Sequence, residues 1–239
     1  NGMTRLYGLF KDAPVLGSLI NPRAAEGDLL EAAFHELQPL LEKALAQETK
    51  DDTAHEMAVT AYGLAKAAEI LAREFTLVAT NVPYLARGKQ NEVLMDYCER
   101  IHPEAKTELA TCFVQRCLDF CVSGSSTALV TPQNWLFLTS YTKLREVLLK
   151  ERTWNLVARL GTNAFQDMNW WAATTSLLCL TAAAPTASHS MTGIDVSAHK
   201  DQAVKASMLR GDFPASLFTK LQSKQHESPD ARIMLEDDA

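Results

Sequence analysis

Four consecutive residues, Asn81-Val82-Pro83-Tyr84, have the clearest potential for chemistry in this sequence. They follow a short apolar run at 75–80, and the length and β-forming composition of this run predict a buried strand. In open parallel α/β sheets, ligands bind at the carboxyl ends of the strands. The side-chain oxygen of Asn81 and the main-chain carbonyl of Val82 could each accept a hydrogen bond from an exocyclic amine, while Tyr84 could stack on the ring, as in pockets for flipped-out bases. The tetrapeptide therefore predicts a site for a planar ring that bears an amino group.

The composition is that of an ordinary globular chain, with 239 residues, 47% hydrophobic and 22% charged. This length allows one or two domains with a sizeable core. No apolar run approaches the roughly 20 residues of a membrane span, and the first residues lack the layout of a secretory signal. The net charge of −6 argues against the whole chain acting as an electrostatic clamp for nucleic acid. Contacts with phosphates would have to come from a local patch or from another domain.

The five cysteines occur without a C-x-x-C pair, and an odd number fits a reducing compartment, which predicts a cytoplasmic protein. Cys117 and Cys121 would share one face of a predicted helix, which is a conceivable spacing for a metal or redox pair. No histidine lies within the next turns to complete a zinc set. We therefore interpret the cysteines as small buried hydrophobes and predict no metal site.

Strands and helices alternate from residue 75 onward, after an amino-terminal part that is predicted to be a helical hairpin. This order predicts an α/β fold with a parallel sheet. The last two strands are joined by a loop too short for a crossover helix, so they should pair antiparallel. The predicted helices are 24–48, 51–74, 91–101, 104–122 (ending at Ser123-Gly124) and 140–151; the predicted strands are 75–80, 126–131, 154–160 and 171–181.

Three regions follow from these elements. Residues 1–74 are predicted to be a helical segment, 75–184 the α/β part and 185–239 a carboxyl-terminal extension. Within the extension the pattern indicates helices at 195–210 and 213–222. The tail from Gln225 is polar and is expected to fray.

The segment at Asn81 resembles the (Asn/Asp/Ser)-Pro-Pro-(Tyr/Phe) catalytic motif of adenine-specific (N6) DNA methyltransferases. The longer string from Thr80 to Gln90, TNVPYLARGKQ, is similar to the form found in BREX-type phage-exclusion methyltransferases and in type IIG restriction–modification enzymes. Val82 stands where the first proline is usual; the carbonyl is kept, but some rigidity is lost because proline fixes φ. Further segments resemble other motifs of these families in the right order: LGSLI at 16–20, ALVTPQNWL at 128–136, LRE at 144–146 and LGTNAF at 160–165.

The resemblance implies the second half of a class I methyltransferase sheet, with S-adenosyl-L-methionine as cofactor and adenine in double-stranded DNA as substrate. It places such an enzyme in a restriction–modification or phage-defence system. Asn81 and the Val82 carbonyl, held by Pro83, would bind the target amine, and Tyr84 would stack on the flipped adenine. Direct attack of the amine on the methyl group needs neither a metal nor a covalent intermediate.

Three more residues gain candidate roles in substrate binding from the same resemblance. Phe165 would contact the other face of the adenine, with a plain core position as the alternative. Arg87 and Lys89 would meet the flanking phosphates. A solvated basic loop is the alternative for this pair.

The glycine-rich motif that binds the cofactor in class I methyltransferases is not found before Phe75. Because the resembling families place that motif ahead of the catalytic one, we expect an internal fragment that begins too late and lacks most of the cofactor site. The strand at 75–80 would then lie at an open sheet edge, which can pair with another chain and so form a homo-oligomer.

Three alternatives remain open on the sequence. The enzyme could act on a glutamine amide of a protein or on an RNA base. The chain could instead be a non-catalytic α/β interaction module whose motif is vestigial, and the tetrapeptide could be an ordinary turn after a strand.

We expect the chain on its own to be inactive and to bind S-adenosylmethionine weakly or not at all, because the segment that carries the cofactor motif in these families is missing. Isothermal titration calorimetry of the chain with the cofactor measures this. Saturable binding with a micromolar dissociation constant would contradict the expectation.

Overall fold

The computed structural model describes residues 7–24, 52–165 and 174–235. The chain divides into two compact units, Asn1–Glu74 and Phe75–Ala239. The helix predicted at 24–48 lies almost entirely outside the described residues.

The first unit consists of helices in its described parts. The predicted second helix is confirmed as α4 (Asp52–Ala72), and the earlier residues form α2 (Ala13–Leu16) and the 3-10 turns Gly17–Leu19 and Pro22–Ala24. Leu16, Leu19 and Ile20 are buried together with Ala65 and Ala68 of α4. No described helix in either unit is long and apolar enough to cross a membrane.

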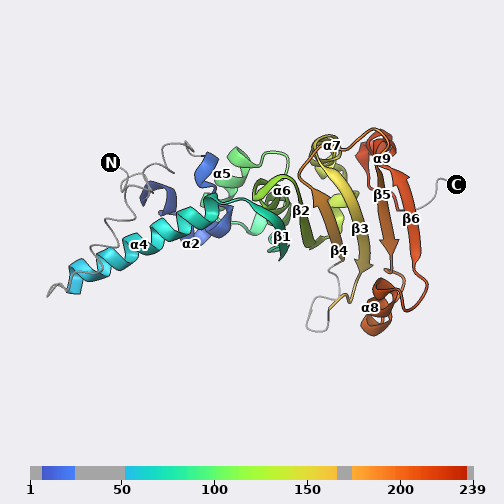
Figure 1. The fold of residues 1–239 in the computed structure, drawn as a ribbon, viewed down its shortest axis with the longest axis horizontal. Helices are drawn as coiled ribbons and strands as arrows, with labels where there is room; N and C mark the ends of the chain where they lie inside the picture. Colours follow the sequence, from blue (N-terminus) through green and yellow to red (C-terminus); the bar gives the residue numbers. More distant parts are fainter. Residues whose placement is uncertain (1–6, 25–51, 166–173, 236–239) are drawn as a thin grey trace. The chain divides into compact units, whose positions relative to one another are not determined.

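The second unit is built on one six-stranded sheet with the order β1-β2-β4-β3-β5-β6 (Figure 1). The strands are β1 (Phe75–Asn81), β2 (Cys121–Pro132), β3 (Thr153–Gly161), β4 (Thr175–Thr181), β5 (Ser190–Asp195) and β6 (Ser216–Leu221). The predicted parallel pairing of β1 with β2 and the antiparallel pairing of β3 with β4 are both confirmed. The mixed α/β class is thereby confirmed as well.

Strand β4 runs antiparallel between β2 and β3, and β5 is parallel to β3. As a result β1, β2, β3 and β5 all point the same way, and their carboxyl ends meet at one edge of the sheet. Helix α8 (Gln202–Arg210) lies at this edge, whereas α7 (Thr142–Glu151) and α9 (Gln222–Glu227) lie at the opposite one (Figure 1). The sheet therefore brings chain segments that are distant in sequence to the end where a ligand would bind.

Of the two α-helices between β1 and β2, one agrees with the prediction and the other is shorter than predicted. Helix α5 (Glu92–Ile101) is confirmed, and its N-cap Asn91 accepts a hydrogen bond from the amide of Leu94 at 2.9 Å. Helix α6 (Leu109–Asp119) is shorter than the predicted 104–122. Ser123-Gly124 does not cap it, because the chain has already entered β2, where Gly124 has a φ of 82°.

This boundary also separates Cys117 from Cys121. Cys117 lies in α6 and Cys121 begins β2, so the two do not share a helix face as predicted. Both side chains are buried. Burial raises the pKa of Cys117 to about 12, so its thiol is protonated at neutral pH.

The core of the second unit is centred on the two middle strands and on the turn after β2. Leu178 and Leu180 of β4 and Trp154 of β3 have no exposed surface. The indole of Trp154 packs against that of Trp135, with ring centroids 5.7 Å apart. Helix α7 adds Leu144 and Leu148, which are both buried.

The carboxyl-terminal residues differ most from the predictions. Residues 213–222 were predicted to be a helix, but 216–221 form β6, which pairs antiparallel with all of β5. That prediction is wrong because the neighbouring strand supplies a full ladder of main-chain partners, and such tertiary context overrides local preference. The region at 185–239, expected as an extension, thus adds two strands to the same sheet and contains α8 where a helix was predicted.

The tail from Gln225, which was expected to fray, is ordered as far as residue 235. The Gln225 side chain is buried and forms two bonds of 2.8 Å with the main chain of Met234. Ile233 and Leu235 are buried as well. For residues 225–235 the expectation is wrong, because this polar segment also contains apolar residues that pack; residues 236–239 lie outside the described part of the chain.

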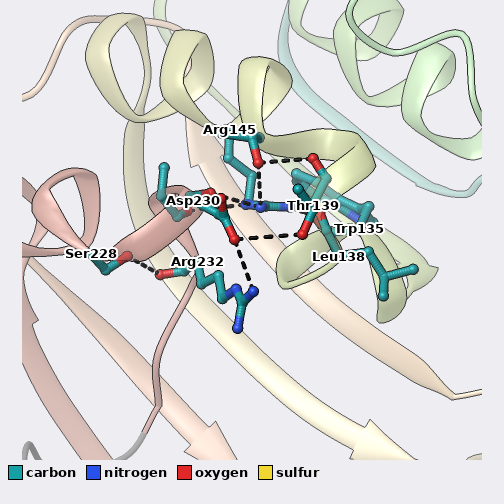
Figure 2. A network of polar contacts seen from close by, with 9 residues as sticks. Trp135, Leu138, Thr139, Arg145, Ser228, Asp230 and Arg232 are labelled. Atoms are coloured by element: carbon teal, nitrogen blue, oxygen red, sulfur yellow. Dashed lines mark hydrogen bonds and ion pairs between the residues drawn. The ribbon is translucent and has the colours of Figure 1, made fainter.

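Arg145 of α7 holds this tail against the turn after β2 (Figure 2). Its Nη1 donates to the carbonyls of Trp135 at 2.6 Å and Leu138 at 2.8 Å. Its Nη2 and Nε donate to the carbonyls of Asp230 at 2.7 Å and Ala231 at 3.1 Å. Burial lowers the pKa of Arg145 to about 10, so the guanidinium is still charged at neutral pH.

We expect Arg145→Met to lower the free energy of unfolding by about 3 kcal/mol, because several buried carbonyls lose their donor. Urea unfolding followed by circular dichroism measures this. Arg210→Met is the control, since Arg210 is exposed and a surface change of this kind stays within about 0.5 kcal/mol. Equal stability of the two variants would contradict the expectation.

Candidate active site

The predicted tetrapeptide begins at the last residue of β1 and is anchored to β2. Asn81 pairs in register with Val130, and the amide of Val82 donates to the Val130 carbonyl at 3.2 Å. The Val82 side chain is buried, with 3% of its surface exposed. The main chain of the motif is therefore fixed to the neighbouring strand at its second residue.

Strand β1 itself lies at an edge of the sheet formed by the described residues, as expected. Its side chains are mostly exposed, including Leu77 at 60%, so the prediction of a buried strand is wrong within this structure. Among the described residues β1 has one neighbouring strand, β2, so little protein surrounds its side chains.

A cavity of about 900 Å³ opens beside the motif at the carboxyl edge of the sheet. This volume falls in the usual range for pockets that bind small molecules. The lining comes from four places: the end of β1 with the motif, the end of β3 with the turn after it, β4, and α8. The lining residues are Asn81, Val82, Tyr84, Leu160, Ala164, Phe165, Leu177, Gln202, Ala203, Lys205, Ala206 and Leu209.

The cavity brings together four of the residues singled out in the sequence, namely Asn81, Val82, Tyr84 and Phe165. Tyr84 and Phe165 keep 37% and 42% of their surface exposed, so each could still cover a ring with its face. Partial burial raises the pKa of Tyr84, and its phenol is therefore neutral at pH 7. Pro83 is exposed and is not part of the lining.

Arg87 and Lys89 are placed outside this lining, in the 3-10 turn Arg87–Lys89. Arg87 forms an ion pair with Glu99, with 2.6 Å between Nη2 and Oε2. Glu99 also pairs with Lys106, and these two hydrogen-bonded cations lower the pKa of its carboxyl group. The role of Arg87 and Lys89 toward phosphates is still a prediction.

The sequence did not predict that α8 would line one side of the cavity, which we call its α8 wall. Lys205 is the most unusual member of this wall because its side chain is 3% exposed. A lysine in a predicted helix ordinarily lies in solvent, and no motif marked this one. The burial of Lys205 could be predicted only from the tertiary fold, because the position of β5 brings α8 to the carboxyl edge of the sheet.

The chemistry of the lining is that of recognition by hydrogen bonds and stacking. Its polar side chains are Asn81, Tyr84, Gln202 and Lys205, and the described lining includes no carboxylate, histidine or cysteine. No group of three potential metal ligands occurs among the described residues of the chain. The lining thus provides hydrogen-bonding groups and ring faces for a planar polar ligand.

Comparison with known proteins identifies the family of this chain. Residues 15–165 match the model of the Eco57I restriction-modification methylase family. The chain belongs to this family. The matched residues of this Eco57I-family chain include the whole motif at Asn81 and end at Phe165.

Two curated relatives share similarity with the Eco57I-family chain. The adenine-specific methyltransferase BrxX of Escherichia coli O9:H4 (strain HS) is 30% identical over 167 residues, which cover 70% of this chain and 13% of BrxX. The adenine-specific methyltransferase PglX of Lacticaseibacillus casei (strain Zhang) is 28% identical over 170 residues, which cover 70% of this chain and 14% of PglX. The chain therefore spans a small part of the length of these relatives.

Among solved structures, the methyltransferase subunit of a type I restriction-modification system from Streptococcus thermophilus is similar with a TM-score of 0.45 and 20% identity. The similarity covers 70% of this chain and 44% of that one. A nuclease-deletion mutant of the type ISP restriction-modification enzyme LlaGI is similar with a TM-score of 0.46 and 12% identity, over 85% of this chain and 22% of that one.

We expect Val82→Pro, which introduces the residue usual in the motif, to destabilise the Eco57I-family chain by about 1 kcal/mol. Proline has no amide hydrogen, so the bond to the Val130 carbonyl is lost. Chemical denaturation of the variant and the parent measures the difference. A variant more stable than the parent would show that the bond contributes less than the rigidity of proline.

Proposed function

We propose that this chain forms the target-binding part of the catalytic domain of an S-adenosylmethionine-dependent enzyme that methylates the exocyclic amine of adenine in DNA. The enzyme would serve in a restriction–modification or phage-defence system. The observation that carries the proposal is the convergence of Asn81, Val82, Tyr84 and Phe165 on one cavity. Membership of the Eco57I family and the names of the relatives support the choice of adenine as the base.

The proposed work of these residues is to hold and orient the amine. The side-chain oxygen of Asn81 and the carbonyl of Val82 accept its two hydrogens, which directs the nitrogen lone pair away from them and increases its nucleophilicity. Because the Val82 amide is bonded to β2, the accepting carbonyl is held in place before the substrate arrives. Orientation of this kind can account for a large part of a rate enhancement.

Tyr84 and Phe165 are proposed to cover the faces of a flipped adenine. They reach the cavity from the ends of β1 and β3, so each could present its ring to a base that is bound there. The apolar lining from Val82, Leu160 and Leu177 would exclude water from the amine. The ring would thus be selected by shape and the amine by its two hydrogens.

The residues of the described cavity fit the base better than the cofactor. The ribose hydroxyls and the ammonium group of S-adenosylmethionine call for acceptors such as carboxylates, and the described lining contains none. When bound, the cofactor supplies the activated methyl group of the reaction. The residues that bind it are not assigned among those described.

Binding of double-stranded DNA is proposed for the complete protein. The net charge of −6 makes this chain a poor electrostatic match for a duplex on its own. Arg87 and Lys89, beside the motif, are its proposed contacts with the flanking phosphates. The oligomeric state is likewise a proposal, since the edge strand β1 could pair with another chain.

In the complete gene product that contains this chain, we expect Asn81→Ala to lower the rate of methyl transfer to DNA on the order of 10²- to 10³-fold, the usual effect of removing one fixed hydrogen-bonding group from an active site. Transfer of labelled methyl groups to genomic DNA, followed by identification of the methylated base, measures this. The expected product is N6-methyladenine.

Two further variants make this test specific. Asn81→Asp keeps an accepting oxygen, and aspartate occurs in the resembling motif, so it should retain part of the activity that Asn81→Ala loses. Tyr84→Phe keeps the ring and should lose far less than Tyr84→Ala, because stacking on a base contributes about 1–3 kcal/mol. Methyl transfer to a protein or to RNA, but not to DNA, would contradict the proposed substrate.

A further inference from the structure

Lys205 is a buried cation of α8 that is bound to the end of β3 and to the turn after it. Its Nζ donates to the carbonyl of Leu160 at 2.6 Å and to the carbonyl of Thr162. With 3% of its surface exposed, the ammonium group would be unfavourable here without such partners, and burial lowers the pKa of Lys205. The sequence thus places a charge inside the protein where it contacts the main chain of one turn.

That turn contains two residues in the left-handed region of backbone conformation. Gly161 has a φ of 69° and Asn163 a φ of 55°, and glycine and asparagine adopt this region more readily than other residues. A Cβ at Gly161 would lie 2.8 Å from Cβ of Ser197, so the turn also packs closely against the segment after β5. The two carbonyls that Lys205 binds flank Gly161, where the strand ends.

The turn and α8 also share an apolar cluster. Met208 of α8 is buried with Ala158 and Leu160 of β3, and Ala164 of the turn packs against the same cluster. The ammonium bonds and this cluster together join α8 to the turn. Lys205, Ala164 and Phe165 then line the same cavity as Asn81 and Tyr84.

We propose that Lys205 is a positioning residue of the active site, whose ammonium group holds the turn at 161–165 so that Phe165 lies against the target base. The proposal rests on the proposed function for its substrate. Lys205 itself lies outside residues 15–165, the part of the chain that matches the family. Helix α8, which lies beyond the matched residues, would accordingly be a determinant of base binding.

The test compares three variants in the complete gene product. Lys205→Met keeps most of the apolar stem and removes the ammonium group, Lys205→Arg keeps a cation with several donors, and Lys200→Met makes the same chemical change at an exposed position shortly before α8. The measurements are kcat and KM for methyl transfer, the KM for S-adenosylmethionine, and amide hydrogen exchange of residues 161–165.

We expect Lys205→Met to lower kcat on the order of 10²-fold, as misplacement of a positioning group by about 1 Å can do. Its KM for the cofactor should stay unchanged, and exchange at 161–165 should become faster. Lys205→Arg should restore part of the activity, and Lys200→Met should match the parent. A purely structural role would lower the amount of folded enzyme without changing kcat per folded molecule.

Unchanged kcat and unchanged exchange at 161–165 in Lys205→Met would overturn the proposal. Should this variant fail to fold, Lys205→Gln, which keeps one donor group on a shorter side chain, is judged by the same criteria. Absence of methyl transfer by the parent protein would overturn the proposed function instead. Hydrogen exchange at 161–165 would in that case still decide whether Lys205 holds the turn.

Discussion

The insertion of β4 between β2 and β3 is the constraint on which the rest of the second unit depends. Because β4 is antiparallel to both neighbours, β2 and β3 keep the same direction although they do not touch each other in the sheet. The ends of β1 and β3 consequently lie at one edge, where Asn81 and Phe165 line a common cavity. If β3 ran in the opposite direction to β2, the turn with Phe165 would lie at the far end of the sheet.

At this edge, rigidity is supplied by partners from outside the motif. Val82 replaces a proline of the usual motif, and its amide hydrogen is used for a bond to Val130, which a proline could not form. The turn that carries Phe165 is likewise tied down by Lys205. In both places a contact between elements constrains a main chain that local sequence leaves free.

The local elements and the order of the motifs could be predicted from the sequence, whereas the contributions of the carboxyl-terminal part could not. The strands at 75–80, 126–131 and 154–160 are short apolar runs between polar turns, so their type follows from composition. Strand β6 has no such signature. Its strand conformation depends on pairing with β5, which the local sequence does not reveal. The same holds for Lys205, whose burial depends on where β5 leads the chain.

The site residues illustrate the same division. Asn81, Val82 and Tyr84 were predicted as candidates because they form one short motif, and Phe165 because its segment resembles another. Ala206 and Leu209 complete the cavity without any pattern that sequence reasoning could use. Exposure of β1 also could not be read from its apolar composition, since it depends on what lies beside the strand.

The bonds of Arg145 have a consequence for modular exchange, both in evolution and in protein engineering. They join the main chain at Asp230 and Ala231 to the turn at Trp135, so the end of the described chain stabilises a loop that is far away in sequence (Figure 2). A crossover between two relatives anywhere from 146 to 229 would combine a guanidinium from one parent with carbonyl acceptors from the other. Recombination that preserves these bonds should therefore favour breakpoints before residue 135 or after residue 231, where the guanidinium and its acceptors come from the same parent.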